Sequence, residues 1–591
     1  MIKKYAKPGA ALAVLLAMLA APYLTSIDPD SRVFRSSVLP FLLCLAAYFP
    51  VRTAFETKNC RELGFVCAFA LIFAFFLSIG SELTVYGAFL PGMGSFIRRL
   101  AVPVMAAPLL GALFSYILSY IPAESSESRT AFKWFPCFAG IAVCYVLVLL
   151  AYFPGIVNYD LMWELVQYQE GIYYGAHPVF HSIITGFLFS TGYALTGSYT
   201  LGAVLYCMVQ ILIMAASFAC VAVFLSKRIP KRAACLILFF FALFPVHGLM
   251  AVSTVKDAMF AAILVLLLIQ LWAVQETPKA FWHSRAAQVR LVLTCLLLSL
   301  LRHNGIFAYA FAGIAMLFLF RNRKAFVLVA VIMVVSMSLP KGLEAAVGAG
   351  NTPASEMMSV PCQQLMRTAK YADMPEDERT ELSSWWLEGS VERYRPHSAD
   401  TSKGGNFDYE RYTREKAQFW GMYMRYGIRY PSIYLEAFLQ NCAGIWNPDD
   451  ISHSHALDSE EWDFVYARTG IIFPEEAGTL EQTPLLKPLH SFLQGIAHSS
   501  RHERIPLISL IFRPSLYVYA LLLLTFLTHV RRVRTQRLVL LPVWGIVLSY
   551  VFSACILVRY AYSFMACVPV MFVLILYAGK TEAGNGSKCI E

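Results

Sequence analysis

The sequence predicts an all-α polytopic membrane protein with one large, mixed but mainly helical domain outside the bilayer. Of its 591 residues, 58% are hydrophobic and only 15% are charged, whereas soluble chains carry about 25% charged residues. The apolar residues form runs long enough to cross a membrane, and one long polar segment interrupts them. This composition excludes a soluble cytosolic enzyme, a disordered scaffold and a nucleic-acid-binding module.

Fourteen apolar stretches are candidate membrane-spanning helices, since a crossing needs about 20 apolar residues, or somewhat fewer if the helix is short. They are residues 10–26, 37–52, 64–80, 100–121, 134–153, 200–226, 233–250, 254–274, 290–302, 305–320, 325–340, 509–530, 537–556 and 561–579. The first has a basic start like a signal peptide, but Pro22 and the lack of a small-x-small site argue against cleavage.

Clusters of Lys and Arg orient these helices, because such residues mark cytoplasmic loops. The clusters are Lys3, Lys4 and Lys7; Lys227, Arg228, Lys231 and Arg232; Arg321, Arg323 and Lys324; and Arg531, Arg532, Arg534 and Arg537. With fourteen crossings, all of these clusters and both termini lie in the cytoplasm. Only Arg98 and Arg99 lie on the outer side, against the charge rule. This count requires that residues 178–196 lie in the outer interface without crossing. The net charge of +10 then reflects cytoplasmic loops rather than an anionic partner.

The spans divide the chain into four parts. We expect an N-terminal transmembrane bundle at 1–133, a catalytic transmembrane module at 134–340, an extracytoplasmic domain at 341–508, and C-terminal helices with a short cytoplasmic tail at 509–591. A first outer loop, 154–199, lies within the second part. Most of the 14 cysteines are expected to be buried thiols, with Cys362 and Cys442 as the one candidate disulfide.

The first outer loop carries carboxylates and histidines but no Lys or Arg. After Pro154-Gly155, which breaks the helix, it contains Asp160, Glu164, Glu170, His177 and His181. A carboxylate just outside the membrane suits a general base that deprotonates a hydroxyl group. The alternative is that Asp160 only caps an interfacial helix. His177 and His181 are four residues apart and could bind a metal, but the spacing is a weak signal and favours hydrogen-bonded interfacial histidines.

Three further outer turns carry cations: Lys256-Asp257, Arg302-His303-Asn304-Gly305 and Arg559-Tyr560. Ionisable groups at membrane depth are costly and are therefore candidates for function. Each could instead snorkel to the interface. Together they suit sugar transfer from a polyprenyl-phosphate donor, in which cations bind the leaving phosphate and a carboxylate takes the proton of the acceptor hydroxyl. One carboxylate suffices, because a phosphate leaving group needs no protonation, whereas a glycosidase uses two.

The order of these motifs resembles the GT-C class of polytopic glycosyltransferases, which includes the protein O-mannosyltransferases and the aminoarabinose transferases. It resembles more closely a family of uncharacterised bacterial membrane proteins grouped with that class, over roughly residues 134–579. The matching motifs are Pro154-Gly155…Asp160, His177-Pro178, Lys256-Asp257, Arg302-His303-Asn304-Gly305, Gln363-Gln364 and Arg559-Tyr560. Relatives often have Gln where this chain has Glu164.

The resemblance implies a GT-C-like glycosyltransferase of the bacterial cytoplasmic membrane. Its base would be Asp160, with Glu164 orienting the acceptor or acting as the base itself, and Lys256, Arg302 and Arg559 would bind the donor phosphate. Supporting roles fall to His177, His181, Asp257, Asn304, Gln363, Gln364 and Tyr560. The expected partners are a polyprenyl-phosphate-linked sugar, an extracytoplasmic glycan, lipid or protein acceptor, and the lipid bilayer, but no nucleic acid.

Nothing in the sequence requires a cofactor, and a divalent metal is unsupported. The main alternative is a transporter or flippase of a lipid-linked or anionic envelope precursor, although the sequence contains no internal repeat of the kind common in transporters. A non-catalytic envelope assembly protein is a second alternative. Neither a phosphate-binding Gly-Lys-Ser/Thr loop nor a His-Glu-x-x-His motif is present, so ATP-driven transport and zinc-protease chemistry are unsupported.

Overall fold

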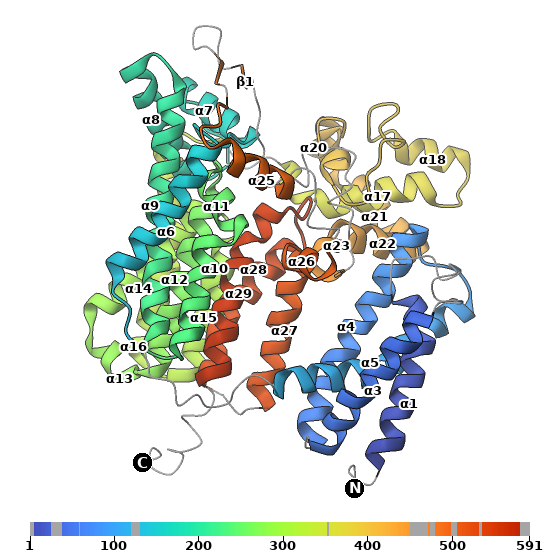
Figure 1. Cartoon of the computed structure of the whole chain (residues 1–591). Coiled ribbons are helices and arrows are strands. Elements are labelled where there is room, and N and C mark those ends of the chain that lie inside the picture. The colour runs from blue at the N-terminus through green and yellow to red at the C-terminus, as the bar shows by residue number, and fades with distance from the viewer. Residues whose placement is uncertain are drawn as a thin grey trace.

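The computed structural model describes residues 5–24, 38–57, 60–119, 130–175, 177–350, 354–448, 471–472, 479–480, 482–497, 505–530 and 535–578. Long helices stand side by side in a broad bundle, and a smaller helical domain covers part of one end (Figure 1). Within these residues the only strands are β1 (Ile471–Ile472) and β2 (Thr479–Leu480), which pair antiparallel. The expected predominantly helical fold is therefore confirmed.

The N-terminal bundle contains four of the long helices. They are α1 (Ala6–Ala20), α3 (Val38–Thr57), α4 (Cys60–Tyr86) and α5 (Met93–Ser119). Small buried side chains such as Ala10, Ala54 and Ala112 line the contact between α1, α3 and α5. Small residues let helix backbones approach closely, which is how helices associate in a membrane, where burial of apolar area supplies little attraction.

The second and larger group of helices contains both the middle and the end of the chain. Its members are α6 (Trp134–Ala151), α9 (Tyr199–Ser226), α10 (Lys231–Leu243), α11 (Pro245–Val252), α12 (Lys256–Glu276), α14 (Arg285–Leu301), α15 (Gly305–Phe320), α16 (Arg323–Ala346), α27 (Pro514–Val530), α28 (Leu541–Tyr550) and α29 (Val558–Ala578). Helix α12 is apolar on all sides and lies at the centre, packed against α9, α14 and α29.

Every predicted apolar stretch falls on helix, but the boundaries differ. Nine described helices are long and apolar enough to span a membrane, or ten if the bent pair α10 and α11 counts as one span with a 43° break. Stretch 233–250 is broken before Pro245, which cannot continue the backbone hydrogen bonds of α10. Stretch 537–556 is helical only to Tyr550. The count of fourteen crossings stays a prediction.

Helix α8 (Val179–Thr196) is one of the nine helices with the length and composition of a span, although we expected this segment to lie in the outer interface. It stands at the top of the bundle in Figure 1, beside the short helix α7 (Tyr159–Glu170). The basic residues Lys3 and Lys4, the cluster 531–534 and the tail beyond residue 578 lie outside the described residues.

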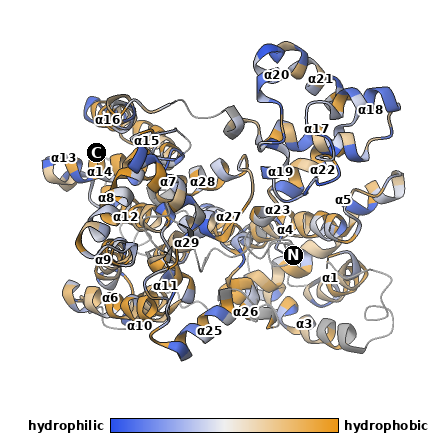
Figure 2. Cartoon of the chain, turned by 90° about the horizontal axis from the view of Figure 1, so that it is seen from above, coloured by the Kyte–Doolittle hydropathy of each residue, from blue (hydrophilic) through white to orange (hydrophobic). Residues whose placement is uncertain are grey.

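The domain between α16 and α27 has a core of its own. It is built from α17 (Ser359–Tyr371), α18 (Glu376–Ser383), α19 (Asp400–Lys403), α20 (Tyr409–Arg414), α21 (Lys416–Arg429), α22 (Pro431–Asn441) and α23 (Ala443–Trp446). Trp385, Phe407 and Phe419 pack together in that core. Seen from above, hydrophilic residues concentrate on α18, α20 and α21 (Figure 2). We call this unit the outer domain.

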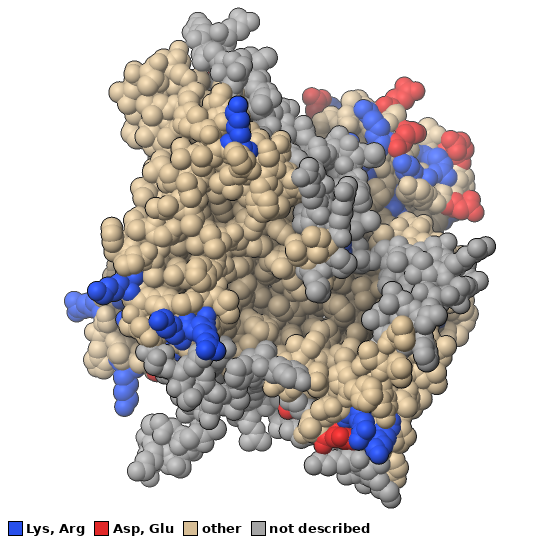
Figure 3. Space-filling view, viewed as in Figure 1, with Lys and Arg blue, Asp and Glu red and all other residues tan. Residues whose placement is uncertain are grey.

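The distribution of charge agrees with a membrane around the bundle. On the face shown in Figure 3, Lys, Arg, Asp and Glu gather toward the two ends, and most of the middle is uncharged. A broad uncharged band between charged ends is the pattern expected of a chain that crosses lipid.

The candidate disulfide does not form. Cys362 and Cys442 are both buried and free. Cys362 lies in the core of the outer domain, whereas Cys442 packs into the core of the membrane bundle. The two thiols therefore belong to different cores, and the expectation of a bridge was wrong.

Candidate functional site

The first outer loop is joined to the turn before α12 by backbone hydrogen bonds. Ile156 N donates to Val252 O (2.8 Å), and Thr254 N donates to Ile156 O (2.9 Å). Gly155 makes this approach possible, because it has a φ of +139° and a Cβ there would come within 2.6 Å of Cys207 Sγ. This pairing places the starts of α7 and α12 next to each other.

Asp160 lies in the first turn of α7 and faces two cations. Its Oδ2 accepts from Arg559 Nη1 (3.1 Å) and lies 3.5 Å from Lys256 Nζ. Asn158 caps the helix by accepting from Asp160 N (3.1 Å), and the same oxygen accepts from Arg559 Nη1 (3.0 Å). Burial raises the pKa of Asp160, but the charges of Arg559 and Lys256 outweigh it and hold that pKa well below its usual range.

Glu164 lies one helical turn further along α7 and is buried, with 1% of its side chain exposed. Its Oε2 is 2.7 Å from His181 Nδ1, while its Oε1 is 3.7 Å from both Lys256 Nζ and His177 Nδ1. Burial raises the pKa of Glu164, but the charge and hydrogen bond of His181, then Lys256, lower it to about 2. Within the described part of the chain, Oε1 has no hydrogen-bond donor.

A chain of hydrogen bonds continues from His181 into helix α9. Gln210 Nε2 donates to backbone carbonyls of Met250 (2.8 Å) and Ser253 (2.6 Å), so its Oε1 faces Tyr206 and accepts from that hydroxyl (3.4 Å). The Tyr206 hydroxyl also lies 2.7 Å from His181 Nε2. His181 is thereby held between Glu164 and Tyr206, and Gln210 in turn holds Tyr206.

Tyr206 and Gln210 were not anticipated from the sequence. They sit four residues apart in the otherwise apolar α9 and are both fully buried. Polar residues at that spacing share a helix face and, inside a membrane span, need partners. This signal in the sequence could have identified them as supports of the acidic loop.

Arg302 lies in the same assembly but has partners of its own. It forms an ion pair with Asp257, and its Nε donates to Asn304 Oδ1 (3.2 Å). The ring of Tyr560 lies between the two arginines, 5.2 Å from Arg302 Cζ and 4.9 Å from Arg559 Cζ. Arg559 Nη2 also donates to the Tyr560 hydroxyl (3.2 Å). The Arg302–Asp257 pair therefore adjoins the Asp160 cluster through Tyr560.

Two of the predicted residues, Gln363 and Gln364, lie in α17 and act within the outer domain. Gln363 Nε2 donates to Arg395 O (2.6 Å), and Gln364 Nε2 donates to Tyr434 O (3.0 Å). Both amides therefore stabilise the fold of that domain, and among the described residues neither forms a hydrogen bond with the charged cluster.

The outer domain nevertheless holds the loop that leads to Arg559. Asn441 Nδ2 donates to Ser553 O (2.8 Å), and Ala399 N donates to Ala554 O (2.7 Å). These bonds fix the α28–α29 loop a few residues before Arg559. The position of that guanidinium group consequently depends on the outer domain.

In the residues that the structure describes, no group of three or more His, Cys, Asp or Glu side chains has the arrangement of a metal site. His177 and His181 do share a neighbourhood, but both turn a ring nitrogen toward Glu164. Burial and the charge of Lys256 lower the pKa of His177, so this ring is neutral near pH 7.

The fold and this cluster define a multi-pass helical membrane protein with buried carboxylates and cations near its outer domain. The chain belongs to a family described as "Family of unknown function (DUF6020)", whose family model matches residues 166–588. The match contains Lys256, Arg302 and Arg559 and begins just after Glu164. No curated protein and no solved structure matches the chain.

Proposed function

We propose that this protein is a membrane glycosyltransferase of the GT-C type, which moves a sugar from a polyprenyl-phosphate donor to an extracytoplasmic hydroxyl. One observation carries the proposal: the carboxylate of Asp160 is flanked by Lys256 and Arg559 beside a polar outer domain. A base and two phosphate-binding cations are the groups that this transfer requires.

The two cations suit the phosphate of the donor. Lys256 Nζ and Arg559 Nη1 both approach the same oxygen of Asp160, at 3.5 Å and 3.1 Å. A phosphate oxygen can take the place of that carboxylate oxygen between them. The negative charge that grows on the departing phosphate is then stabilised by groups already in position and shielded from water. Arg302 adjoins them through the Tyr560 ring but is paired with Asp257.

Binding of the donor would also activate the base. In the unliganded protein Asp160 is a weak base, because Arg559 and Lys256 lower its pKa. When the phosphate engages these cations, their attraction for the carboxylate falls and the pKa of Asp160 rises toward its ordinary value. Asp160 is therefore the stronger base when a donor is bound.

The reaction balances with this one carboxylate. The acceptor hydroxyl loses its proton to Asp160 and its oxygen bonds to the anomeric carbon. The bond from that carbon to the phosphate oxygen breaks, and polyprenyl phosphate leaves with the electron pair. General-base catalysis of this kind contributes roughly 10²–10⁴-fold to a rate. Glu164, as the partner of His181, orients α7 and α8 rather than accepting the proton.

The proposal includes fourteen crossings, cytoplasmic termini and a bacterial cytoplasmic membrane. The helical character of all fourteen predicted stretches supports the count. The polar side chains His181, Ser182 and Thr185 on α8 are buried, and α8 packs against the polar helix α7. These features support an α8 that lies outside the hydrocarbon layer.

The decisive experiment separates transfer from transport. The protein is reconstituted in vesicles with a panel of polyprenyl-phosphate sugars carrying a radiolabelled sugar, and both release of polyprenyl phosphate and movement of intact donor are measured. We expect release that depends on Asp160 and requires an acceptor. Movement of intact donor without cleavage of the sugar–phosphate bond would contradict the proposed glycosyltransferase activity and would favour a transporter.

A further inference from the structure

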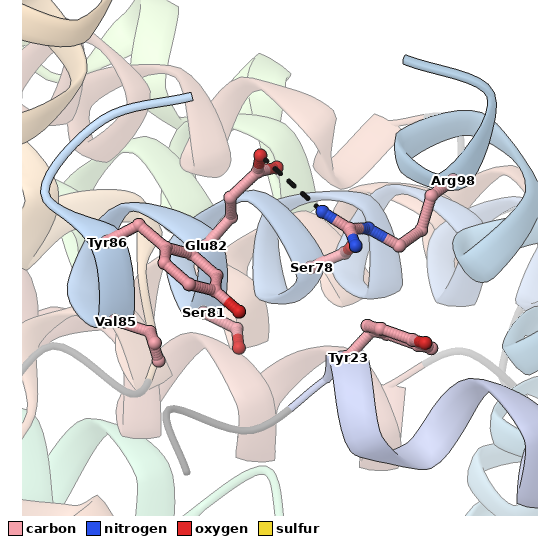
Figure 4. A pocket seen from close by; sticks show the side chains of 7 residues that line it. All are labelled: Tyr23, Ser78, Ser81, Glu82, Val85, Tyr86 and Arg98. Carbon is pink, nitrogen blue, oxygen red and sulfur yellow. Dashed lines mark ion pairs between the residues drawn. The ribbon is translucent and has the colours of Figure 1, made fainter. Parts of the chain in front are cut away.

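A second cationic site lies in the N-terminal bundle, away from Asp160. It is an open hollow between the end of α1 and the α4–α5 hairpin (Figure 4). Two tyrosines, two serines, one valine, one acidic and one basic side chain line it. They are Tyr23, Ser78, Ser81, Glu82, Val85, Tyr86 and Arg98.

The charges around the hollow do not cancel. Glu82 is bonded by Arg99, whose Nε donates to Oε2 (2.8 Å) and whose Nη2 donates to Oε1 (2.9 Å), and by Leu90 N (2.7 Å). Arg98 Nη2 forms a longer ion pair with Glu82 Oε1 at 3.9 Å, beyond hydrogen-bond distance (Figure 4). Arg99 thus neutralises Glu82, and the positive charge of Arg98 remains.

The guanidinium group of Arg98 is held at the hollow but has unused donors. Its Cζ lies 5.2 Å from the centre of the Tyr23 ring, and 30% of the side chain is exposed. Among the described residues it donates no hydrogen bond. A planar guanidinium with free donors is suited to two oxygens of one phosphate group.

The hollow is at the same end of the molecule as the outer domain. The turn after α4 contacts that domain, since Arg367 Nη2 donates to Gly87 O (2.6 Å) and Phe89 N donates to Glu436 Oε1 (2.9 Å). Its lining residues on α4, Ser78 to Tyr86, begin where the apolar stretch of that helix ends. Tyrosines are enriched at this level of a membrane protein, where lipid headgroups lie.

An apolar stripe leads from the bundle surface to the hollow. Leu12, Leu15 and Leu19 on α1 are each more than half exposed, and they follow helical spacing toward Tyr23. Such a stripe on a membrane-spanning helix contacts acyl chains. The stripe and Arg98 together match the two parts of an anionic phospholipid, its acyl chains and its phosphate.

We propose that this hollow binds the phosphate of an anionic phospholipid of the outer leaflet, with Arg98 as the phosphate ligand and the leucine stripe of α1 along the acyl chain. The bound lipid would explain why Arg98 lies on the outer side, against the charge rule that the other basic clusters follow. The inference stands on the N-terminal bundle alone and does not depend on the proposed glycosyltransferase activity.

The test measures retained lipid on the purified full-length chain. The protein is taken from vesicles of phosphatidylcholine with one part in five phosphatidylglycerol into mild detergent, and bound lipid is counted by native mass spectrometry. We expect the unaltered protein to retain phosphatidylglycerol selectively and Arg98→Gln to lower retention by about tenfold, as for loss of a charged phosphate contact. Because Arg98 makes no hydrogen bond in the described structure, this variant should fold normally, which its elution volume and unfolding temperature check.

Arg425→Gln is the matched control, since Arg425 is an exposed arginine beside a tyrosine ring, 5.9 Å away, in the outer domain. It should retain lipid as the unaltered protein does. Equal retention by Arg98→Gln would overturn the proposal. Displacement of phosphatidylglycerol by millimolar inorganic phosphate, with Arg98-dependent binding of the phosphate itself, would overturn the assignment to a lipid.

Discussion

Arg559 Nη1 lies 3.1 Å from Asp160 Oδ2, although 399 positions of the chain separate the two residues. Asp160 comes from the first outer loop, and Arg559 begins the last helix, α29. The guanidinium group is almost completely buried, with 1% of it exposed. The charged cluster is therefore assembled only when the two ends of the larger helix group have packed together.

Replacement of Asp160 by Asn tests the base. Asn keeps the size and can still accept from Arg559, but it cannot take a proton, so turnover should fall by at least about 10²-fold. Affinity for polyprenyl phosphate should be kept or increased, because a negative charge next to the phosphate has been removed. Steady-state transfer and equilibrium binding measure the two effects.

Glu170→Gln is the control for that variant, since it removes an exposed carboxylate at the other end of the same helix. Its turnover should be unchanged. Near-normal turnover of Asp160→Asn together with inactivity of Glu164→Gln would move the base to Glu164. If neither substitution lowered turnover, the glycosyltransferase proposal itself would fail.

Arg559 can be tested through binding alone, before the sugar is known. Arg559→Lys keeps a charge but cannot bond Asn158, Asp160 and Tyr560 at once, as the guanidinium does. Loss of one charged hydrogen bond is worth about 1.5–3 kcal/mol. We expect a weaker affinity for polyprenyl phosphate, measured by titration in detergent.

The loss of affinity for polyprenyl phosphate in Lys256→Gln and Arg302→Gln should depend on how close each side chain lies to Asp160. Lys256 contacts that carboxylate directly, whereas Arg302 is occupied by Asp257 and Asn304. We therefore expect the larger loss of affinity for Lys256→Gln. Unchanged affinity in all three variants would remove the phosphate site from this cluster.

Acid should destabilise the protein partly through Glu164. Its pKa is about 2 in the folded protein, against 4.5 for an unperturbed glutamate. A carboxyl group with a depressed pKa stabilises the folded state above pH 4.5, and this contribution is lost as the pH falls from about 4.5 toward 2. Unfolding temperatures between pH 3 and pH 7 should therefore fall less steeply for Glu164→Gln than for the unaltered protein. A parallel pH dependence would contradict the ion pair with His181.

Asn441 should position Arg559 from the outer domain. Asn441→Ala removes the hydrogen bond to Ser553 O in the loop before α29. A neutral hydrogen bond contributes about 0.5–1.5 kcal/mol, so affinity for polyprenyl phosphate should weaken by up to about tenfold. Tyr423→Phe removes a hydrogen bond of the same kind inside the outer domain, to Gln364 Oε1, and should leave affinity unchanged. Equal effects of the two variants would indicate a general loss of domain stability instead.

The orientation in the membrane can be tested with a pair of single cysteines. Glu410 is exposed on the outer domain, and Lys279 is exposed on α13 (Pro278–His283), which the predicted topology places in the cytoplasm. A membrane-impermeant thiol reagent added to intact cells should label Glu410→Cys and not Lys279→Cys. The opposite result would invert the topology.

The sequence by itself determined the helical class and the group of residues worth testing. Long apolar runs leave the backbone no alternative to helix in lipid, and the cost of charge at membrane depth makes Asp160, Lys256 and Arg559 conspicuous without knowledge of their neighbours. The structure brings these three side chains into contact. Periodicity and motif order were sufficient here because each signal is local.

Only the tertiary structure decided which charged and polar groups became partners. Arg302 pairs with Asp257, Gln363 and Gln364 bond within the outer domain, and Cys362 and Cys442 enter different cores. Each outcome depends on which helices pack side by side, and the apolar surfaces of membrane helices resemble one another too closely for hydropathy to identify neighbours. The division of roles between Asp160 and Glu164 also required the fold. The packing of α8 against α7, and of α9 against α8, gives Glu164 its histidine and leaves Asp160 to the cations.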